Sequence, residues 1–341
     1  MKNYFFVAAL IFLPFVLLAQ EVRIGFGSCF DQNRSYEIWD TLQKENFDYF
    51  IFLGDNVYTD NEQQFETAYQ KLFQNQAFRS FFEKTNILSI WDDHDFGKND
   101  AGKEFDQKTY TKQLFLDYWY KQKQPSLYQE LLKREGLYHS FLINQKGLKV
   151  LVILLDTRWF RDPLKRKDPL VIHYLPHEDI QKTLLGDTQW NWLEKELRRK
   201  ADFYIIASSI QVIPEEHRFE KWHNFPHEKQ KLLQIIQKLK IKNLIFISGD
   251  RHFAEISKKD ILTNGKPFSL YEITASSLNQ ELPKSFQQEV LQEKNQYRLF
   301  EAYLKPNYGF LIIQKKQKSL SIQGGIKDEN SKIIKKIDIQ A

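Results

Sequence analysis

The sequence is poor in cysteine, with Cys29 alone among 341 residues. One cysteine excludes an intramolecular disulfide and any zinc site built from several cysteines. An excess of charge of one sign is also missing, because 49 basic and 44 acidic residues leave a net charge of +5. The basic residues form no concentrated stripe, so we expect no nucleic-acid-binding module. No internal repeat is present, which excludes repeat architectures. With 42% hydrophobic residues, the chain has ample material for a core.

Long hydrophobic runs are absent after residue 20. Before it, residues 4–19 are almost wholly apolar, and Lys2 is the only charge before Glu21. The run is short for a membrane-spanning helix, which needs ~20 apolar residues. We therefore expect a signal peptide at 1–19, cut after Ala19, and export to the periplasm or the cell exterior without a membrane anchor. The alternative is an uncleaved N-terminal anchor.

Six apolar runs of strand length recur along the rest of the chain. They are continuously apolar rather than alternating, which is typical of strands buried on both faces in a layered α/β domain. The runs are 22–27, 48–53, 86–91, 148–155, 203–208 and 243–248. No Pro-, Gly- or Ser-rich linker interrupts them, so we expect one domain over 20–341.

Segments with helical spacing of apolar residues lie between these runs. One begins near Ser35, a candidate N-cap, and others are centred on 65–73, 110–119, 190–197 and 232–239. The chain ends differently, with short β-like runs at 309–314, 319–323 and 333–339. These runs predict an antiparallel β segment at the C-terminal end of an α+β fold.

Polar side chains of the metal-binding type follow four of the predicted strands. Such clusters at the carboxyl ends of strands are where open α/β sheets build their sites. They comprise Cys29 in GSC, Asp55, Asn56 and Tyr58 in GDNVY, Asp92 to Asp95 in WDDHD, and Asp250 and His252 in GDRH. Each has a simpler interpretation on its own, since Gly-Asp after a strand is often a turn and a lone cysteine is often a small buried apolar residue.

The WDDHD cluster favours a metal over these simpler interpretations. Three carboxylates and an imidazole within four residues repel one another unless a cation or solvent compensates, and if the segment is buried a metal is the simplest compensation. Carboxylate and imidazole groups suit hard or borderline divalent and trivalent ions. A thiolate from Cys29 and a phenolate from Tyr58 favour a strongly charged ion such as Fe(III). Two metals sharing one carboxylate would use this set of ligands economically.

The ordered series of motifs resembles the alkaline phosphatase D (PhoD-like) metallophosphatases of the calcineurin-like phosphoesterase superfamily. The series is GSC, GDNVY, WDDHD, LLDTRW, GDTQWNWLEKEL, SSIQVI with a following W-x-NFP, and ISGDRH. It covers about residues 22–325. The resemblance implies an α/β, four-layer αββα sandwich with metals at the sheet edge. It also implies one Fe(III) with one or two Ca(II) ions, other divalent metals being alternatives.

The resemblance also implies roles for single residues. Asp55 would bridge the metals, Asp93 would bind the second metal, and Asp250 and His252 would be further ligands. Cys29 and Tyr58 would bind the iron. His94 would touch the phosphate or protonate the leaving group, and Arg158 would clamp the phosphate. Asn56 is a candidate for substrate binding, with a turn role as its alternative. Asp95 departs from the family, where many members have Glu.

These expectations predict an exported hydrolase of phosphate monoesters in which a metal-bound hydroxide attacks phosphorus in line. The alternative is a phosphodiesterase or phospholipase-C-like enzyme with the same site. A third reading is a non-catalytic binder that keeps the metal site for structure. A phosphate ester is the expected partner, and the sequence does not specify an oligomeric state.

Overall fold

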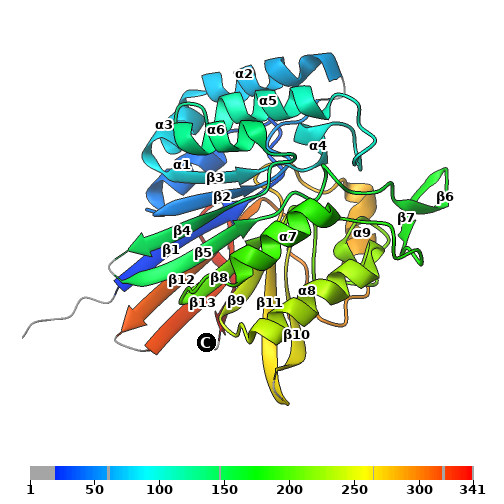
Figure 1. Ribbon diagram of the computed structural model, residues 1–341. Helices are drawn as coiled ribbons and strands as arrows, with labels where there is room; N and C mark the ends of the chain where they lie inside the picture. Colours follow the sequence, from blue (N-terminus) through cyan, green and yellow to red (C-terminus); the bar gives the residue numbers. More distant parts are fainter. Residues whose placement is uncertain (1–19, 60–61, 146, 264, 317–318, 340–341) are drawn as a thin grey trace, which may run out of the picture.

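The computed structural model describes residues 20–59, 62–145, 147–263, 265–316 and 319–339. The signal peptide expected at 1–19 lies outside these ranges. Two six-stranded sheets dominate the described chain (Figure 1). The first has the order β14 (Ile333–Ile339), β13 (Ser319–Asp328), β12 (Asn307–Lys316), β1 (Gln20–Gly27), β2 (Tyr49–Leu53), β3 (Asn86–Ile90). The second has the order β10 (Ala254–Thr263), β11 (Lys266–Ala275), β9 (Leu244–Ser248), β8 (Phe203–Ala207), β5 (Leu148–Leu154), β4 (His139–Gln145).

Helices cover the outer face of each sheet, so the layers run helix, sheet, sheet, helix. The first sheet is covered by α1 (Glu37–Lys44), α2 (Phe65–Gln74), α3 (Gln76–Lys84), α5 (Lys108–Trp119) and α6 (Pro125–Lys133). The second is covered by α7 (Gly186–Leu197) and α8 (Pro226–Leu239). The α/β sandwich expected from the resemblance is therefore the fold observed.

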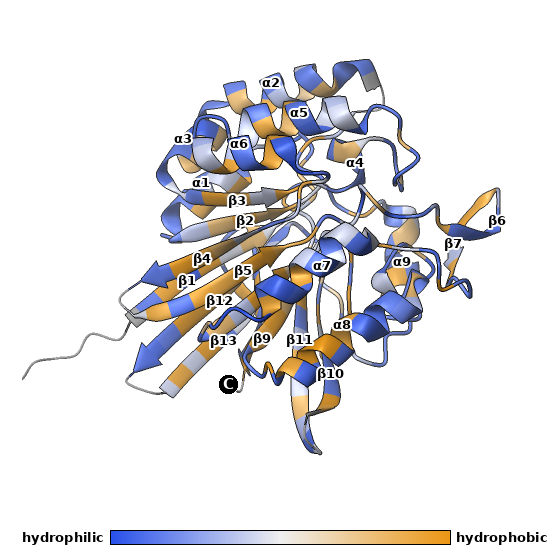
Figure 2. Ribbon diagram, in the orientation of Figure 1, coloured by the Kyte–Doolittle hydropathy of each residue, from blue (hydrophilic) through white to orange (hydrophobic). Residues whose placement is uncertain are grey.

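The continuous apolar character of the central strands follows from this layering. In β2, Phe50 and Phe52 pack under the helices, whereas Ile51 and Leu53 point into the space between the sheets. Successive side chains of a strand point to opposite faces, so a strand buried on both faces needs apolar residues at every position. Figure 2 shows the same apolar colouring along β5 and β9 of the second sheet.

Strand direction brings several chain segments to one edge. β1, β2 and β3 run parallel, with Phe26 opposite Ile51 in the register of the first pair. In the second sheet β5, β8, β9 and β11 are parallel. All six predicted strands and the antiparallel C-terminal segment are confirmed. The N-cap of α1 is Tyr36, one residue after the predicted Ser35. Ser35 Oγ nevertheless accepts a hydrogen bond from Glu37 N at 3.3 Å.

Two small elements without a sequence prediction lie beside the edge where the parallel strands end. The hairpin of β6 (Lys165–Asp168) and β7 (Val171–Leu175) projects from the body, and α9 (Lys284–Gln292) lies near it (Figure 1). The short helix α4 (Asp93–Phe96) and the 3-10 turns at Glu62–Gln64 and Trp222–Asn224 complete the elements of the described chain. Among the described residues, no helix combines the length and apolarity that crossing a membrane requires.

Candidate metal centre

The predicted motifs meet at the edge where the parallel strands end. Cys29 follows β1, Asp55 follows β2, and Asp93 follows β3, while Asp250 and His252 follow β9 of the other sheet. The two edges are joined by backbone contacts, because Ser28 forms a β-bridge with Ser276. Residues from both sheets therefore face one space.

Two glycines let the motif loops approach one another. Gly54 has φ +101°, and a Cβ built there would lie 2.4 Å from Asp92 Cβ. At Gly249 an added Cβ would lie 2.4 Å from Ser28 Oγ. Real side-chain atoms do not tolerate such distances, so the Gly of each Gly-Asp pair is what brings its aspartate against the neighbouring motif.

Four of the residues that meet here have a left-handed backbone. The φ angles are +59° at Cys29, +52° at Asp55, +71° at Asp250 and +56° at His252. This conformation is uncommon for residues other than glycine and persists only where the surroundings enforce it. The backbone is therefore bent to aim these side chains into the shared space.

The first group of candidate ligands is formed by Cys29, Asp55 and His252, whose ligand atoms lie within 4.8 Å of one another. The Cys29 thiol donates to Asp55 Oδ2 at 3.5 Å. Tyr58 OH donates to the same oxygen at 2.9 Å and lies 3.3 Å from His252 Nε2. Thiol, phenol, carboxylate and imidazole thus converge, as the resemblance implies for an iron site.

The second group is formed by Asp55, Asp93 and His94, also within 4.8 Å. His94 N donates to Asp55 Oδ1 at 3.3 Å, and Asp100 N donates to Asp93 Oδ2 at 2.6 Å. The other oxygen of Asp93, Oδ1, is buried and has no hydrogen-bond partner among the described residues. Asp55 belongs to both groups, with Oδ2 toward the first and Oδ1 toward the second, which is the arrangement of a bridging carboxylate.

The pKa values of the clustered groups show that their negative charges are not balanced by the protein. Burial, together with the nearby Asp93, raises the pKa of Asp55 well above its usual value. Burial and Asp92 do the same to the pKa of Asp250. Burial raises the pKa of the Cys29 thiol to about 11 and lowers that of His252 to about 4. Cations bound between these groups would lower the raised pKa values of the three acids and favour the neutral imidazole of His252, so the donors present fit a pair of metal ions.

Asp93 is an exception among these carboxylates. Burial opposes its ionisation, but the charges of His94 and Arg158 and the amide of Asp100 hold its pKa below the usual range. It is therefore ionised and keeps an unpartnered oxygen at the second group.

Asp95, the departure from the family pattern, fixes the loop that carries Asp55. Its carboxylate is fully buried and accepts from Asp55 N at 3.3 Å, from Asn56 N at 3.2 Å and from Asp92 N at 2.5 Å. Asn56 belongs to the same hydrogen-bond network. Its Nδ2 donates to Ile90 O at 2.9 Å and to Asp95, and the residue does not line the cavity. This placement agrees with the turn role that was the alternative to substrate binding.

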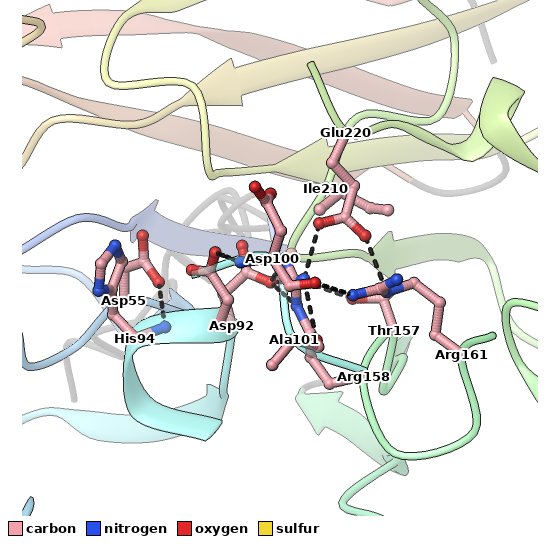
Figure 3. Close-up of polar contacts among 12 residues, drawn as sticks. Asp55, Asp92, His94, Asp100, Ala101, Thr157, Arg158, Arg161, Ile210 and Glu220 are labelled. Atoms are coloured by element: carbon pink, nitrogen blue, oxygen red, sulfur yellow. Dashed lines mark hydrogen bonds and ion pairs between the residues drawn. The ribbon is translucent and has the colours of Figure 1, made fainter. Parts of the chain in front are cut away.

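Arg158 is buried in the protein and does not line the cavity at the candidate ligands. Its guanidinium is fully buried and held between Asp92 and Glu220 (Figure 3). Arg158 Nε donates to Asp92 Oδ1 and Nη1 donates to Glu220 Oε2, both at 2.6 Å. The direct phosphate contact expected of Arg158 does not fit this placement. Sequence spacing could not reveal its partners, because Asp92 and Glu220 lie 66 and 62 residues away.

A cavity of about 220 Å³ opens onto the ligands. Asp55, Asp93, His94, Asp250 and His252 line it. Asp250 stands in its wall without belonging to either group of three. The structure therefore brings seven of the nine candidate residues together, and their roles as ligands or acid remain a prediction.

Three residues that support the site carry no signal in the sequence. Ser276 Oγ lies 3.1 Å from Cys29 Sγ and accepts from His252 N at 2.8 Å. Glu220 pairs with Arg158 and Arg161, and Asp100 donates its amide to Asp93. All three come from irregular segments, where periodicity gives no indication of which residue points inward.

Comparisons with known proteins agree with this geometry. The family model described as PhoD-like phosphatase matches residues 24–320. A solved structure titled "Structure of PhoD" matches with a TM-score of 0.69 and 16% identity, covering 94% of this chain and 73% of that one. A second, titled "GAP50 the anchor in the inner membrane complex of Plasmodium", matches with a TM-score of 0.56 and 14% identity, covering 94% and 89%. A search of curated protein sequences finds no significant match.

Proposed function

Since the chain belongs to the PhoD-like phosphatase family, we propose that it is a metal-dependent hydrolase of phosphate monoesters. Family membership supports phosphoester hydrolysis as the general reaction. The observation that carries the finer proposal is the pair of ligand groups that share Asp55. Two metals held by one carboxylate are a recurrent device for clamping a phosphoryl group.

The residues divide between the two ions as follows. Cys29, Tyr58, Asp55 and His252 would hold the first ion, and Asp55 and Asp93 the second, with Asp250 beside them. When bound, the metals would supply charge stabilisation for the phosphoryl oxygens and lower the pKa of water to make a nucleophile. We propose Fe(III) for the first ion, because a thiolate and a phenolate both favour a strongly charged metal, and Ca(II) for the second.

We propose that His94 handles the leaving group. It is half-buried, lines the cavity, and its ring lies against that of Tyr58 with the centroids 4.3 Å apart. Its backbone amide is tied to Asp55, which fixes the start of α4. We assign the His94 imidazole to proton donation to the departing alcohol oxygen, a task for which proteins use histidine most often.

Arg158 acts on this site through Asp92. The Asp92 carboxylate takes hydrogen bonds from Arg158 and from Ser209 Oγ at 2.7 Å. Because Asp92 directly precedes Asp93, this buried pair fixes the start of α4 and with it the second ligand group. Arg158 is therefore a positioning residue in the proposal.

A phosphodiesterase is the second candidate, and one observation favours it. A second cavity of about 430 Å³ shares Asn99 and Asp100 with the ligand cavity. This adjoining space would accommodate the second alcohol group of a diester. The monoester proposal and this alternative use the same metal site.

One assay separates them. Purified protein is tested on p-nitrophenyl phosphate and bis-p-nitrophenyl phosphate at pH ~8–9, with and without chelator and added metal. We expect chelator-sensitive cleavage of the monoester, and Asp93→Ala should lose at least about 10³-fold in kcat. Asp40→Ala, an exposed aspartate of α1, is the matched control and should keep wild-type activity.

The outcomes are distinct. Preference for the diester moves the assignment to the phosphodiesterase. Absence of turnover of either ester, with metal shown to be bound, would contradict catalysis and leave the non-catalytic binder. Activity that survives complete metal removal would contradict the metal-dependent proposal.

Export is also part of the proposal. The apolar N-terminal run of residues 4–19 supports it. Mass spectrometry of the protein from a secreting host should find a mature chain that begins at Gln20. A chain that retains residues 1–19 would contradict cleavage.

A further inference from the structure

Apolar side chains form one wall of the ligand cavity. We call the set the apolar wall; it comprises Ile172, Phe219, Leu282, Pro283 and Phe286. Ile172 belongs to β7, Phe219 to the segment before the 3-10 turn at Trp222–Asn224, and Phe286 to α9. Three separate parts of the chain therefore contribute apolar groups to a cavity whose remaining lining carries the candidate metal ligands.

Most of the apolar wall is open to solvent, although Leu282 also packs against the small core cluster of Phe253, Val290 and Ala302. Ile172 is 38% exposed, and Phe219, Leu282 and Phe286 are partly exposed. Apolar side chains that gather beside a concave polar site while remaining open to solvent mark a binding surface. The rings of Phe219 and Phe286 meet edge to face, with centroids 6.5 Å apart, so together they present one continuous surface.

Arg218 holds the three parts of the wall together. It donates to Ile172 O of the hairpin and to both carboxylate oxygens of Glu289 on α9, at 2.5 and 3.1 Å. Its guanidinium also lies over the Phe219 ring, 4.4 Å from the centroid, and 5.8 Å from that of Phe286. One side chain thus fixes the spacing of all three, which makes the wall a built feature.

The charges near the wall disfavour substrates with extra anionic groups. Arg251 lines the cavity, but its guanidinium pairs with Glu293 at 2.6 Å and contacts His217. Asp100 and Glu220 also line the cavity. An additional phosphate or carboxylate on the substrate would meet these acids without an unpaired arginine to bind it.

We propose that the apolar wall is a subsite for the organic group of the substrate, so that the enzyme prefers phosphate esters of small apolar alcohols, aromatic or alkyl, over esters of polyols and sugars. This inference rests on the proposed function, since it assigns the substrate class of the same site. The volume of 220 Å³ is below the ~300–1,000 Å³ of pockets for drug-sized ligands, which limits the organic group to a single ring or short chain.

The test compares esters of primary alcohols that differ in polarity. The substrates are n-butyl phosphate, benzyl phosphate and glycerol 1-phosphate, or their methyl diesters if the enzyme turns over diesters. We expect kcat/KM for the butyl or benzyl ester to exceed that for the glycerol ester by at least about 10-fold. The butyl and benzyl arms separate an alkyl from an aromatic preference.

Two variants locate the preference. Phe286→Ala and Ile172→Ala should each reduce the ratio of apolar to glycerol kcat/KM at least about threefold, by removing contact area. The loss of kcat/KM in each variant should be larger for the apolar esters than for the glycerol ester. Phe286→Leu should restore most of the ratio. Leu291→Ala, an exposed position of α9 outside the cavity lining, is the matched control and should leave the ratio unchanged.

The outcomes distinguish this inference from the proposed function. Turnover of all esters without preference, or equal effects of the variants on apolar and glycerol esters, would overturn the subsite while leaving the proposed function standing. Failure of the wild-type enzyme to turn over any ester would overturn both.

Discussion

Replacing Arg158 with alanine separates a structural from a substrate-binding role for this residue. The guanidinium and its partners Asp92 and Glu220 are almost completely excluded from solvent. Removing it leaves two buried carboxylates, of which Glu220 keeps Arg161 at 2.9 Å and Asp92 keeps the Ser209 hydroxyl. The substitution therefore leaves buried negative charge without the cation that balances it.

The expected magnitude follows from such pairs. Breaking a buried ion pair by removing one partner costs about 3–5 kcal/mol of the free energy of unfolding. With a urea m-value of about 3 kcal/mol per M, the unfolding midpoint should fall by about 1–1.7 M. Activity should fall as well, because Asp92 precedes the ligand Asp93. That fall should appear in kcat and metal content rather than in KM.

Urea unfolding followed by tryptophan fluorescence measures the first effect. Arg198→Ala is the matched control, because Arg198 and Glu194 form an exposed pair at 4.0 Å. Its loss should change the free energy of unfolding by less than about 1 kcal/mol. If Arg158→Ala unfolded like the wild type while KM rose strongly, Arg158 would contact the substrate and the structural reasoning would be refuted.

Four further substitutions, one of them a control, test other parts of the site and the fold. Gly54→Ala should lower the free energy of unfolding by at least about 2–3 kcal/mol and abolish activity, because its Cβ would strike Asp92. Gly265→Ala has a similar φ of +71° but open space around it, so in urea unfolding it should lose only about 1 kcal/mol; equal losses would refute the clash. Cys29→Ser should reduce bound metal from two ions toward one and remove any thiolate-to-metal absorption band, and an unchanged spectrum and metal content would speak against Cys29 as a ligand. The buried His139, whose pKa burial lowers from 6.5 to about 4, binds its proton more readily in the unfolded chain. Stability should therefore fall by roughly 2 kcal/mol between pH 7 and pH 5, and His139→Gln should remove that part of the pH dependence in urea titrations.

The sequence was informative wherever burial acts on a regular element. The strands before Cys29, Asp55 and Asp250 are buried on both faces over most of their length, so apolar residues predominate in them and each run stands out. Because β1, β2 and β3 are parallel, residues that follow them reach one edge, which is why the candidate ligands could be grouped before their positions were known.

Side-chain partners across the fold could not be predicted in the same way. The pairing of Arg158 with Asp92 and Glu220 depends on how three separate irregular segments meet, and none of them has a periodic pattern. The hairpin of β6 and β7 has mostly exposed residues, so it lacks the apolar signal of a strand. The apolar wall was missed for the same reason, since its members come from three short or irregular segments.

Metal stoichiometry of the wild type and of Asp55→Ala tests the central claim most directly. Asp55 belongs to both ligand groups, whereas each other member belongs to one. Elemental analysis of the purified proteins should find two metal ions per wild-type chain and neither in Asp55→Ala, with phosphoesterase activity lost together with them. A wild-type protein that hydrolyses phosphate esters without bound metal, or an Asp55→Ala variant that keeps both ions, would contradict a binuclear centre bridged by Asp55.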